Sequence, residues 1–205
     1  MPEPTACADV SPPRARADTA IVRVARDDDL SALTAIYAHH VLHGSASFEL
    51  ESPSVEEMGR RRLEVLARGL PYLVVEQHGC LAGFAYANVF RPRPAYRFSV
   101  ENSIYLDPGT IGRGLGTMLL RALIEACTEA GARQMLAVIG DSANVASIAL
   151  HARCGFRFAG VLRATGWKHG RWLDTVLMQI ALGPGDLAPG HDSPPASGPT
   201  TVSDP

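Results

Sequence analysis

The sequence lacks two features that would assign it to a membrane or to nucleic acid. It has no apolar run close to the ~20 residues that a membrane-spanning helix requires. Its 19 Lys and Arg are balanced by 21 Asp and Glu, a formal net charge of −2, so it also lacks the basic excess typical of nucleic-acid-binding proteins. We therefore expect neither a membrane nor a nucleic acid as a partner.

Cysteine is scarce, and its spacing matches no metal-binding pattern. The four cysteines are Cys7, Cys80, Cys127 and Cys154, and no two are close enough for a CxxC motif or a zinc knuckle. This usage favours reduced thiols in a cytoplasmic protein. We expect Cys127 and Cys154 to pack as small apolar residues.

Both ends of the chain lack the apolar residues that a core requires. Residues 1–20 have no apolar segment of the kind found in a signal peptide, and residues 183–205 are rich in Pro, Gly, Ser and Asp. The sequence therefore predicts a disordered leader over 1–20, one folded domain over 21–182 and a disordered tail over 183–205.

Hydrophobic patterning within 21–182 alternates between the strand period of two and the helix period of 3.6. It predicts an α/β domain with the order β-α-α-β-β-β-α-β-α-β-β. The expected strands are 21–25, 72–77, 80–90, 98–106, 134–140, 156–164 and 172–182; the expected helices are 30–43, 54–68, 113–130 and 144–154. The segment 91–97 contains two prolines, which have no N–H to donate, and is expected to be a loop.

A cluster of glycines precedes the third predicted helix, in the segment TIGRGLGTMLL from Thr110 to Leu120. Glycine turns at helix N-termini bind phosphate because the missing Cβ lets a ligand reach the backbone N–H groups and the positive end of the helix dipole. A P-loop is excluded because no Lys-Ser/Thr pair follows. A dinucleotide fingerprint is excluded because the glycines are two apart and follow the fourth strand. A plain strand–helix turn is the alternative.

A second segment, NVASIALHARCGF over 144–156, combines with this glycine cluster. Together the two segments resemble those of the GNAT superfamily of N-acetyltransferases. The resemblance implies a mixed sheet of about seven strands, with two splayed central strands and four flanking helices, that binds acetyl-CoA and needs no metal. It also implies which residues bind acetyl-CoA: Ile104, Tyr105, Leu106, Gly112, Arg113, Gly114, Leu115, Gly116, Thr117, Asn144 and Ser147. Ile111 stands where the superfamily usually has Gln or Arg.

Two side chains are candidates for proton transfer. Alternation along the strand 98–106 puts Glu101, Ser103 and Tyr105 on one face, and a carboxylate near splayed strands is expected to have a raised pKa. By default, a strand glutamate is simply solvated. His151 stands where many GNAT enzymes have a tyrosine that protonates the leaving thiolate, and an imidazole can act as an acid or base near pH 7.

The segment FRPRPAYRFSVENSIY over 90–105 resembles that of the phosphinothricin N-acetyltransferases, as do SASFELESP over 45–53 and LRATGWKHGRWLDT over 162–175. The resemblance implies that Arg91, Arg93, Tyr96 and Phe48 bind the acceptor, a small glutamate-like amino acid, and that His151 pairs with the glutamate. Guanidinium groups suit an anionic acceptor because they bind oxyanions bidentately. Arg97-Phe98 replaces an acidic-aromatic pair that often follows the tyrosine.

Several alternatives remain open at this point. One alternative is an enzyme that acetylates a different amine, and another is a non-catalytic acyl-CoA-binding module. His39 and His43 lie one helical turn apart and raise the question of a metal site, but the metalloprotease pattern needs a Glu where His40 stands. The family resemblance favours a homodimer, in which contacts between subunits complete the pocket.

Overall fold

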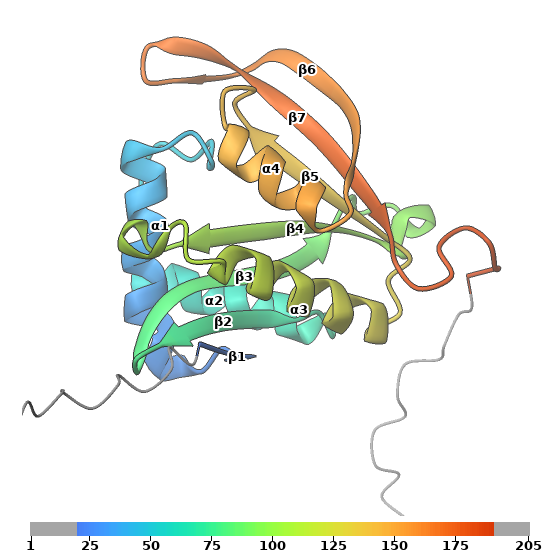
Figure 1. The fold of residues 1–205 in the computed structure, drawn as a ribbon, viewed down its shortest axis with the longest axis horizontal. Coiled ribbons are helices and arrows are strands. Elements are labelled where there is room, and N and C mark those ends of the chain that lie inside the picture. Colours follow the sequence, from blue (N-terminus) through green and yellow to red (C-terminus); the bar gives the residue numbers. More distant parts are fainter. Residues whose placement is uncertain (1–19, 191–205) are drawn as a thin grey trace, which may run out of the picture.

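The structure, a computed structural model, describes residues 20–190. Residues 1–19 of the predicted leader, with Cys7, and residues 191–205 of the predicted tail lie outside the described part. Within it, seven strands form one sheet in the order β1-β2-β3-β4-β5-β7-β6 (Figure 1). The strands are β1 (Ile21–Val24), β2 (Tyr72–Gln77), β3 (Cys80–Val89), β4 (Ser99–Leu106), β5 (Gln134–Gly140), β6 (Arg157–Lys168) and β7 (Arg171–Ala181). No described helix is long and apolar enough to cross a membrane.

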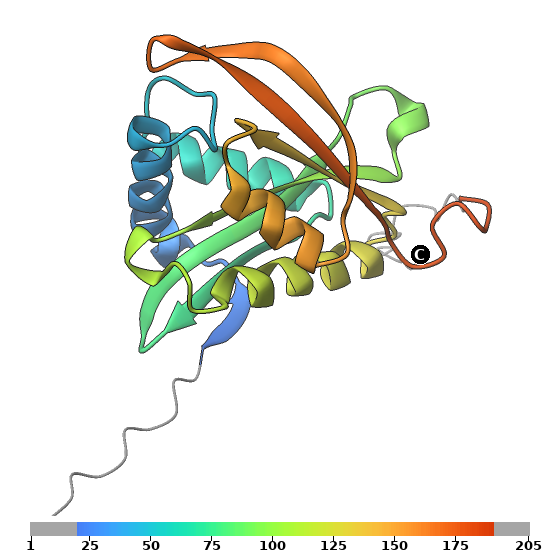
Figure 2. The same ribbon diagram turned by 45° about the horizontal axis from the view of Figure 1, so that its top comes forward.

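Four helices cover the two faces of the sheet, as predicted. Helices α1 (Leu30–His43) and α2 (Val55–Ala67) pack on one face, where a core forms around Leu33, Val74 and Phe84. Helix α3 (Leu115–Glu129) packs on the other, against a core that includes Val75, Leu119 and Met135. Helix α4 (Val145–Arg153) lies on the same side, beside β5 (Figures 1 and 2). Alternate residues of β2 therefore supply the two cores, as a strand period of two requires.

The only parallel pair in the described sheet is β4 with β5, and it separates halfway along. The register runs from Ser99↔Gln134 to Asn102↔Ala137, although β4 continues to Leu106 and β5 to Gly140. The other pairs are antiparallel. The divergence confirms the predicted splayed strands, and it leaves main-chain groups of both strands without a ladder partner at the centre of the sheet.

Most predicted boundaries agree with the structure to within one residue, and three differ by more. Helix α3 begins at Leu115, not near 113, because Gly112 and Gly114 have left-handed φ values of 85° and 81°. Strand β6 continues past 164 to Lys168, because a register shift between Leu162 and Gly166 lets the chain resume pairing with β7. Residues 183–190 form turns, and the Arg133 guanidinium donates to the Pro189 carbonyl there.

The buried thiol prediction is confirmed for Cys127, which is fully buried in α3. Burial raises its pKa to about 12. Cys154 is only partly buried, at the C-terminal end of α4, and Cys80 is exposed. All three are free thiols.

Candidate active site

A cavity of about 440 Å³ opens where β4 and β5 separate. The loop between α1 and α2 forms one wall, β3, β4 and β5 form the floor, and α4 closes the far side. The residues that line it are Tyr37, Ala46, Ser47, Phe48, Glu49, Tyr86, Glu101, Asn102, Ser103, Ile104, Tyr105, Ala137, Val138, Ile139, Gly140, Asn144, Ser147, His151 and Thr175. Glu101, His151, Phe48, Asn144 and Ser147, all singled out from the sequence, therefore share one cavity.

Glu101 lies on the third residue of β4, just before the strands part. Desolvation by burial raises the pKa of its carboxyl group, because a buried site disfavours the charged form. No described side chain forms an ion pair or hydrogen bond with this carboxylate. Glu101 is thus a partly desolvated carboxylate available to accept a proton within the cavity.

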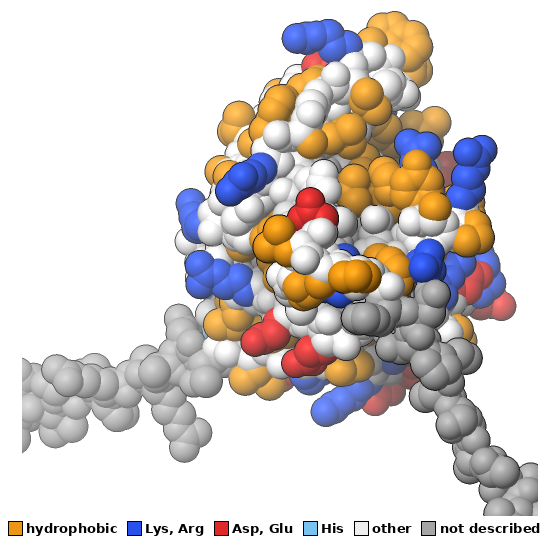
Figure 3. Space-filling model, turned by 90° about the vertical axis from the view of Figure 1, so that its right-hand side faces the viewer, with side chains coloured by type: hydrophobic (Ala, Val, Ile, Leu, Met, Phe, Trp, Pro, Cys, Tyr) orange, Lys and Arg blue, Asp and Glu red, His pale blue; other side chains and the backbone are white. Residues whose placement is uncertain are grey.

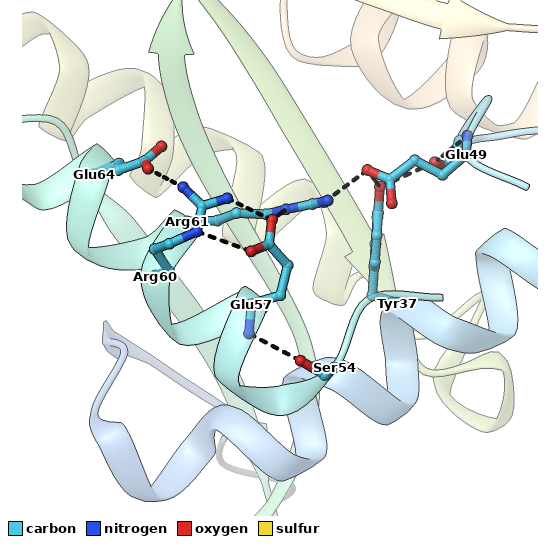
Figure 4. A network of polar contacts seen from close by, with 8 residues as sticks. Tyr37, Glu49, Ser54, Glu57, Arg60, Arg61 and Glu64 are labelled. Atoms are coloured by element: carbon cyan, nitrogen blue, oxygen red, sulfur yellow. Dashed lines mark hydrogen bonds and ion pairs between the residues drawn. The ribbon is translucent and has the colours of Figure 1, made fainter. Parts of the chain in front are cut away.

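Glu49 is the second carboxylate in the cavity wall, and its charge is already compensated. The Arg61 guanidinium lies 2.7 Å from Glu49 Oε1, and the Tyr37 hydroxyl donates to the same oxygen at 3.0 Å (Figure 4). Arg61 also donates to Glu57 in the first turn of α2, which Ser54 caps by accepting from the Glu57 N–H. The network fixes the loop between α1 and α2 and distinguishes Glu49 from the unpaired Glu101.

His151 is buried, with 2 % of its surface exposed, and its partner is Asn102. Its Nε2 lies 3.0 Å from Asn102 Oδ1 and its Nδ1 lies 2.8 Å from the Ser147 carbonyl oxygen. The resemblance implied a pairing with the glutamate, and the structure instead pairs His151 with the neighbouring residue on the opposite face of β4. Burial lowers the pKa of His151.

The glycine turn leaves open space in front of the α3 N-terminus. A Cβ added to Gly112 or Gly114 would meet no atom within 4 Å. The first N–H groups of α3 have no acceptor within the helix, so the turn offers N–H donors and the positive end of the helix dipole to an anion. Gly116 differs: its Cβ would crowd Leu106 and Leu150, so glycine here permits close packing of α3, β4 and α4.

The side chains of the other predicted cofactor residues point in several directions. Leu115 and Tyr105 are buried in the core, Ile104 and Leu106 are partly buried against it, and Thr117 is partly exposed. The Arg113 guanidinium donates to Gln77 at 3.3 Å. These residues can contact a ligand at the gap mainly through their backbone.

The backbone of β4 has free hydrogen-bonding groups in this gap. Ser99 accepts from Phe90, and Asp107 donates to Ala82, so alternate residues from 99 to 107 bond to β3. The main-chain groups of Ile104 and Leu106 consequently face β5, beyond the end of its ladder with β4. His40, which the sequence analysis considered only for the metal question, donates from Nε2 to the Leu106 carbonyl at 2.8 Å. The Leu106 N–H remains directed at the gap.

Asn144 and Ser147 form the first turn of α4. The Asn144 side chain is the N-cap of the helix and accepts from the Ser147 N–H at 3.2 Å. This contact explains the Asn-x-x-Ser spacing as a helix cap. Both residues also line the cavity, so the cap places the α4 N-terminus at its edge.

The predicted acceptor residues are divided between two places. Phe48 lines the cavity, whereas Arg91, Arg93 and Tyr96 do not. They lie on the loop before β4, at the end of the strand away from the gap; Arg91 stacks on the Phe90 and Tyr96 rings. Basic side chains are scattered over the side of the molecule that carries this loop (Figure 3). The arginines therefore do not contact the cavity of their own chain.

The tip of the β6–β7 hairpin holds the loop that carries Phe48. Lys168, which is 3 % exposed, donates from Nζ to the Ser47 carbonyl at 2.6 Å, and His169 contacts the Gly44 carbonyl. Gly166 is glycine because the Phe48 ring occupies the position of a Cβ. Sequence reasoning quoted this segment only as a resemblance, because Lys168 lies between Trp167 and the turn residue His169, where a lysine is usually exposed.

The described residues contain no group of three or more His, Cys, Asp or Glu arranged to hold a metal ion. His39 and His43 do lie close together, with ring centroids 5.0 Å apart. His40, the third member of that cluster, is engaged with the backbone of β4.

Comparisons with known proteins agree with this geometry. The model of the acetyltransferase (GNAT) family matches residues 33–156. The chain belongs to the GNAT acetyltransferase family. It is 57% identical over 165 residues to a phosphinothricin N-acetyltransferase of Alcaligenes faecalis, covering 80% of this chain and 84% of the relative. It is 36% identical over 161 residues to the L-methionine sulfoximine/L-methionine sulfone acetyltransferase of Salmonella typhimurium, covering 78% and 94%.

A solved GNAT structure has the same fold. The phosphinothricin acetyltransferase of Sinorhizobium meliloti, in complex with acetyl-CoA, superposes with a TM-score of 0.82 at 47% identity and covers 85% of this chain and 94% of its own. The fold and the family expected from the glycine turn and the segment 144–156 are thereby confirmed.

Proposed function

We propose that this GNAT acetyltransferase transfers the acetyl group of acetyl-CoA to the α-amino group of a small, glutamate-like amino acid. Phosphinothricin, methionine sulfoximine and methionine sulfone are the candidate acceptors. The observation that carries the proposal is the partly desolvated, unpaired Glu101 at the opening between β4 and β5. The names of the relatives that match about 80% of the chain support the acceptor class.

The acetyl-CoA site fits two features of the chain. The open glycine turn at Gly112 and Gly114 suits the pyrophosphate, because it offers backbone N–H groups to an anion. The gap beyond Asn102 suits an extended arm, because the ladder between β4 and β5 ends there and leaves main-chain groups such as the Leu106 N–H without a ladder partner. Acetyl-CoA supplies the activated acyl group, and the protein holds it against Glu101.

The side chains divide the proton transfers between them. An amino group is protonated at neutral pH and must lose a proton before it attacks a thioester, and Glu101 accepts that proton, directly or through a water. The Leu106 N–H stabilises the negative charge that develops on the thioester oxygen. His151 supplies a proton to the departing thiolate. No described cysteine lines the cavity, which favours direct attack over an acetyl-enzyme.

The acceptor's negative charge calls for a guanidinium or ammonium group, and the described lining residues of the cavity include no Lys or Arg; Arg61, behind the wall, is already paired with Glu49. Arg91 and Arg93 lie on an exposed loop away from the cavity of their own chain. We infer that the enzyme is a homodimer in which this loop of one subunit reaches the cavity of the other. The free thiols of the described part favour a cytoplasmic location.

The test of the activity is CoA thiol release from acetyl-CoA with a panel of amines. The panel contains phosphinothricin, methionine sulfoximine, methionine sulfone, glutamate, spermidine and kanamycin. Turnover on the first three supports the proposal. Turnover only on spermidine or kanamycin would replace the acceptor class, and acetyl-CoA binding without any turnover would favour a non-catalytic acyl-CoA-binding module.

The dimer is tested by complementation. Glu101→Gln and the double variant Arg91→Ala/Arg93→Ala are each inactive if both elements are needed. In a mixed dimer with one symmetric interface, one of the two sites has both elements intact. Mixing the two variants after partial unfolding should therefore restore roughly a quarter of the activity. No recovery, or a monomer by light scattering, would contradict the shared site.

A further inference from the structure

Asn102 occupies the point where the central strands separate, and both ends of its amide are used. It is the last residue of β4 that pairs with β5. Its Nδ2 donates to the Leu136 carbonyl on β5 at 2.9 Å, and its Oδ1 lies 3.0 Å from His151 Nε2. Only 6 % of Asn102 is exposed, so neither end of the amide can exchange its partner for bulk water.

The bond to Leu136 determines which way the amide faces. A carbonyl oxygen can only accept, so the NH₂ group must point at Leu136, and the amide oxygen must point at His151. An amide oxygen also only accepts. Nε2 of His151 is therefore favourably placed only when it carries a hydrogen.

The other ring nitrogen of His151 meets the same kind of partner. Nδ1 lies 2.8 Å from the Ser147 carbonyl oxygen, and the Ser147 hydroxyl is farther away, at 3.4 Å. A neutral imidazole has one N–H and one lone pair, so one of its nitrogens then directs a lone pair at an acceptor. Both contacts are satisfied only when both nitrogens carry hydrogen.

We propose that Asn102 is a positioning residue for His151 that stabilises the hydrogen on Nε2 and so favours the imidazolium, the form of the ring that can act as an acid. The role rests on the proposed function, because it matters for catalysis only if His151 acts as the acid. Loss of the Nε2 hydrogen leaves two acceptors facing each other. The amide must then turn away or give up Leu136, and this couples the protonation of His151 to the junction of β4 and β5.

The surroundings of His151 offer no competing charge at short range. Phe156 packs edge-on against the ring at 5.0 Å, and Ala137 lies beside Asn102 on β5. On its own helix, Arg153 is exposed, and on α3, Arg121 interacts with Cys154. The titratable side chains that line the same cavity are Glu49, Glu101, Tyr37, Tyr86 and Tyr105. Burial opposes the imidazolium, and Asn102 acts against that effect.

Two substitutions should move the His151 titration in opposite directions. Asn102→Leu keeps the branching at Cγ but has no acceptor, so protonation of Nε2 gains no hydrogen bond and the His151 pKa falls. Asn102→Asp has the same shape and adds a negative charge beside Nε2, so the pKa rises. Because a hydrogen bond to a charged group is worth more than one to a neutral group, we expect about one pH unit in each direction.

The measurement is a two-dimensional ¹H–¹⁵N NMR titration of the histidine ring nitrogens without substrate. The His151 signals are assigned by their absence in His151→Gln. Val100→Ala is the matched control, since Val100 is also buried on the same face of β4, two residues earlier. It should destabilise the strand without moving the His151 titration. The pH profile of kcat should shift with the His151 pKa in each Asn102 variant.

An unchanged His151 titration in Asn102→Leu would overturn the proposal. If that variant does not fold by circular dichroism, Asn102→Asp decides, and an unchanged titration there overturns it equally. An equally large shift of the His151 pKa in Val100→Ala would mean that strand packing, not the Asn102 amide, sets this pKa, and would also overturn the proposal. The NMR titration requires no amine substrate. If the proposed function is wrong, turnover is therefore absent while the predicted NMR shifts are still observed.

Discussion

Replacing Glu101 with Gln should separate activity from stability. The substitution keeps the shape of the side chain and removes the proton-accepting carboxylate. General bases typically contribute about 10²- to 10⁴-fold to rate, so kcat should fall by that factor. The affinity for acetyl-CoA should hardly change, because the glycine turn and the gap beyond Asn102 are untouched. Isothermal titration calorimetry and CoA release measure the two quantities.

The same substitution should stabilise the protein at neutral pH. Burial raises the pKa of Glu101 in the folded state, so the folded chain binds more protons than the unfolded chain at pH values between the two pKa values. Stability therefore falls as pH rises through that window, and above the window the carboxylate is a buried charge that costs stability. Each unit of the shift corresponds to about 1.4 kcal/mol, and about 1 kcal/mol moves the Tm of a domain of this size by about 2–4 °C. Glu101→Gln should thus raise Tm.

The pH dependence provides a third readout of the same carboxylate. Wild-type kcat should fall as the pH drops through the raised pKa, since a protonated carboxyl group cannot accept a proton. This acidic limb should vanish in Glu101→Gln. Glu125→Gln, on the exposed side of α3, is the control and should change neither kcat nor Tm. Full activity of Glu101→Gln at matched acetyl-CoA affinity would refute the assignment of the base, and a lower Tm would refute the desolvation argument.

Three other changes test separate parts of the site. Gly114→Ala should fold, since its Cβ meets open space, although the left-handed φ of 81° strains alanine by about 1 kcal/mol. Because the added Cβ obstructs the glycine turn, we expect about tenfold weaker acetyl-CoA binding, measured by calorimetry. Unchanged affinity would show that the turn is not part of the acetyl-CoA site. Lys168→Met loses the bond to the Ser47 carbonyl, so the loop carrying Phe48 should loosen and the acceptor KM rise by about tenfold or more, with the acetyl-CoA KM as the internal control. In the native protein at pH 8, a thiol reagent should alkylate the exposed Cys80 but not Cys127, whose pKa is raised to about 12. Cys127 should react only after denaturant is added, and peptide mass spectrometry measures both sites. Labelling of Cys127 in the native protein would contradict its burial.

The order of elements could be predicted because hydrophobic spacing reports directly on burial. Helix α3 buries Leu119, Leu120 and Leu123 completely, which is the apolar face that its sequence predicts. Element boundaries depend instead on single backbone angles. The start of α3 is set by the left-handed glycines, and β6 overruns its predicted end because Ala164 itself adopts a φ of 52° at a bulge. No pattern in the sequence indicates that an alanine will do so.

The candidate site was predictable where a residue is unusual for its position. Glu101 stands out on a strand with a buried face, and its environment agrees with the expected pKa direction. Asn102 carries the same kind of signal, because it lies between Val100 and Ile104 on the core-facing side of β4, and a buried amide must be hydrogen-bonded. The identity of its partners depends on where β4 and β5 part, and this is a property of the assembled sheet.

The family resemblance implied that Arg91 and Arg93 bind the acceptor, and strand geometry explains why they do not line the cavity of their own chain. A strand advances about 3.3 Å per residue, so the loop that ends at Phe98 lies about 10 Å behind Glu101, while the opening between β4 and β5 extends from Asn102 in the other direction. Residues that precede a strand cannot reach a gap that opens at its far end without a turn that brings the chain back. Residues 91–97 instead turn outward, with a short 3₁₀ turn at Pro94–Tyr96 stiffened by its proline. The negative charge of the acceptor must then be balanced either by arginines of another chain or by N–H groups of the same chain alone. The mixed-variant experiment decides between these two arrangements.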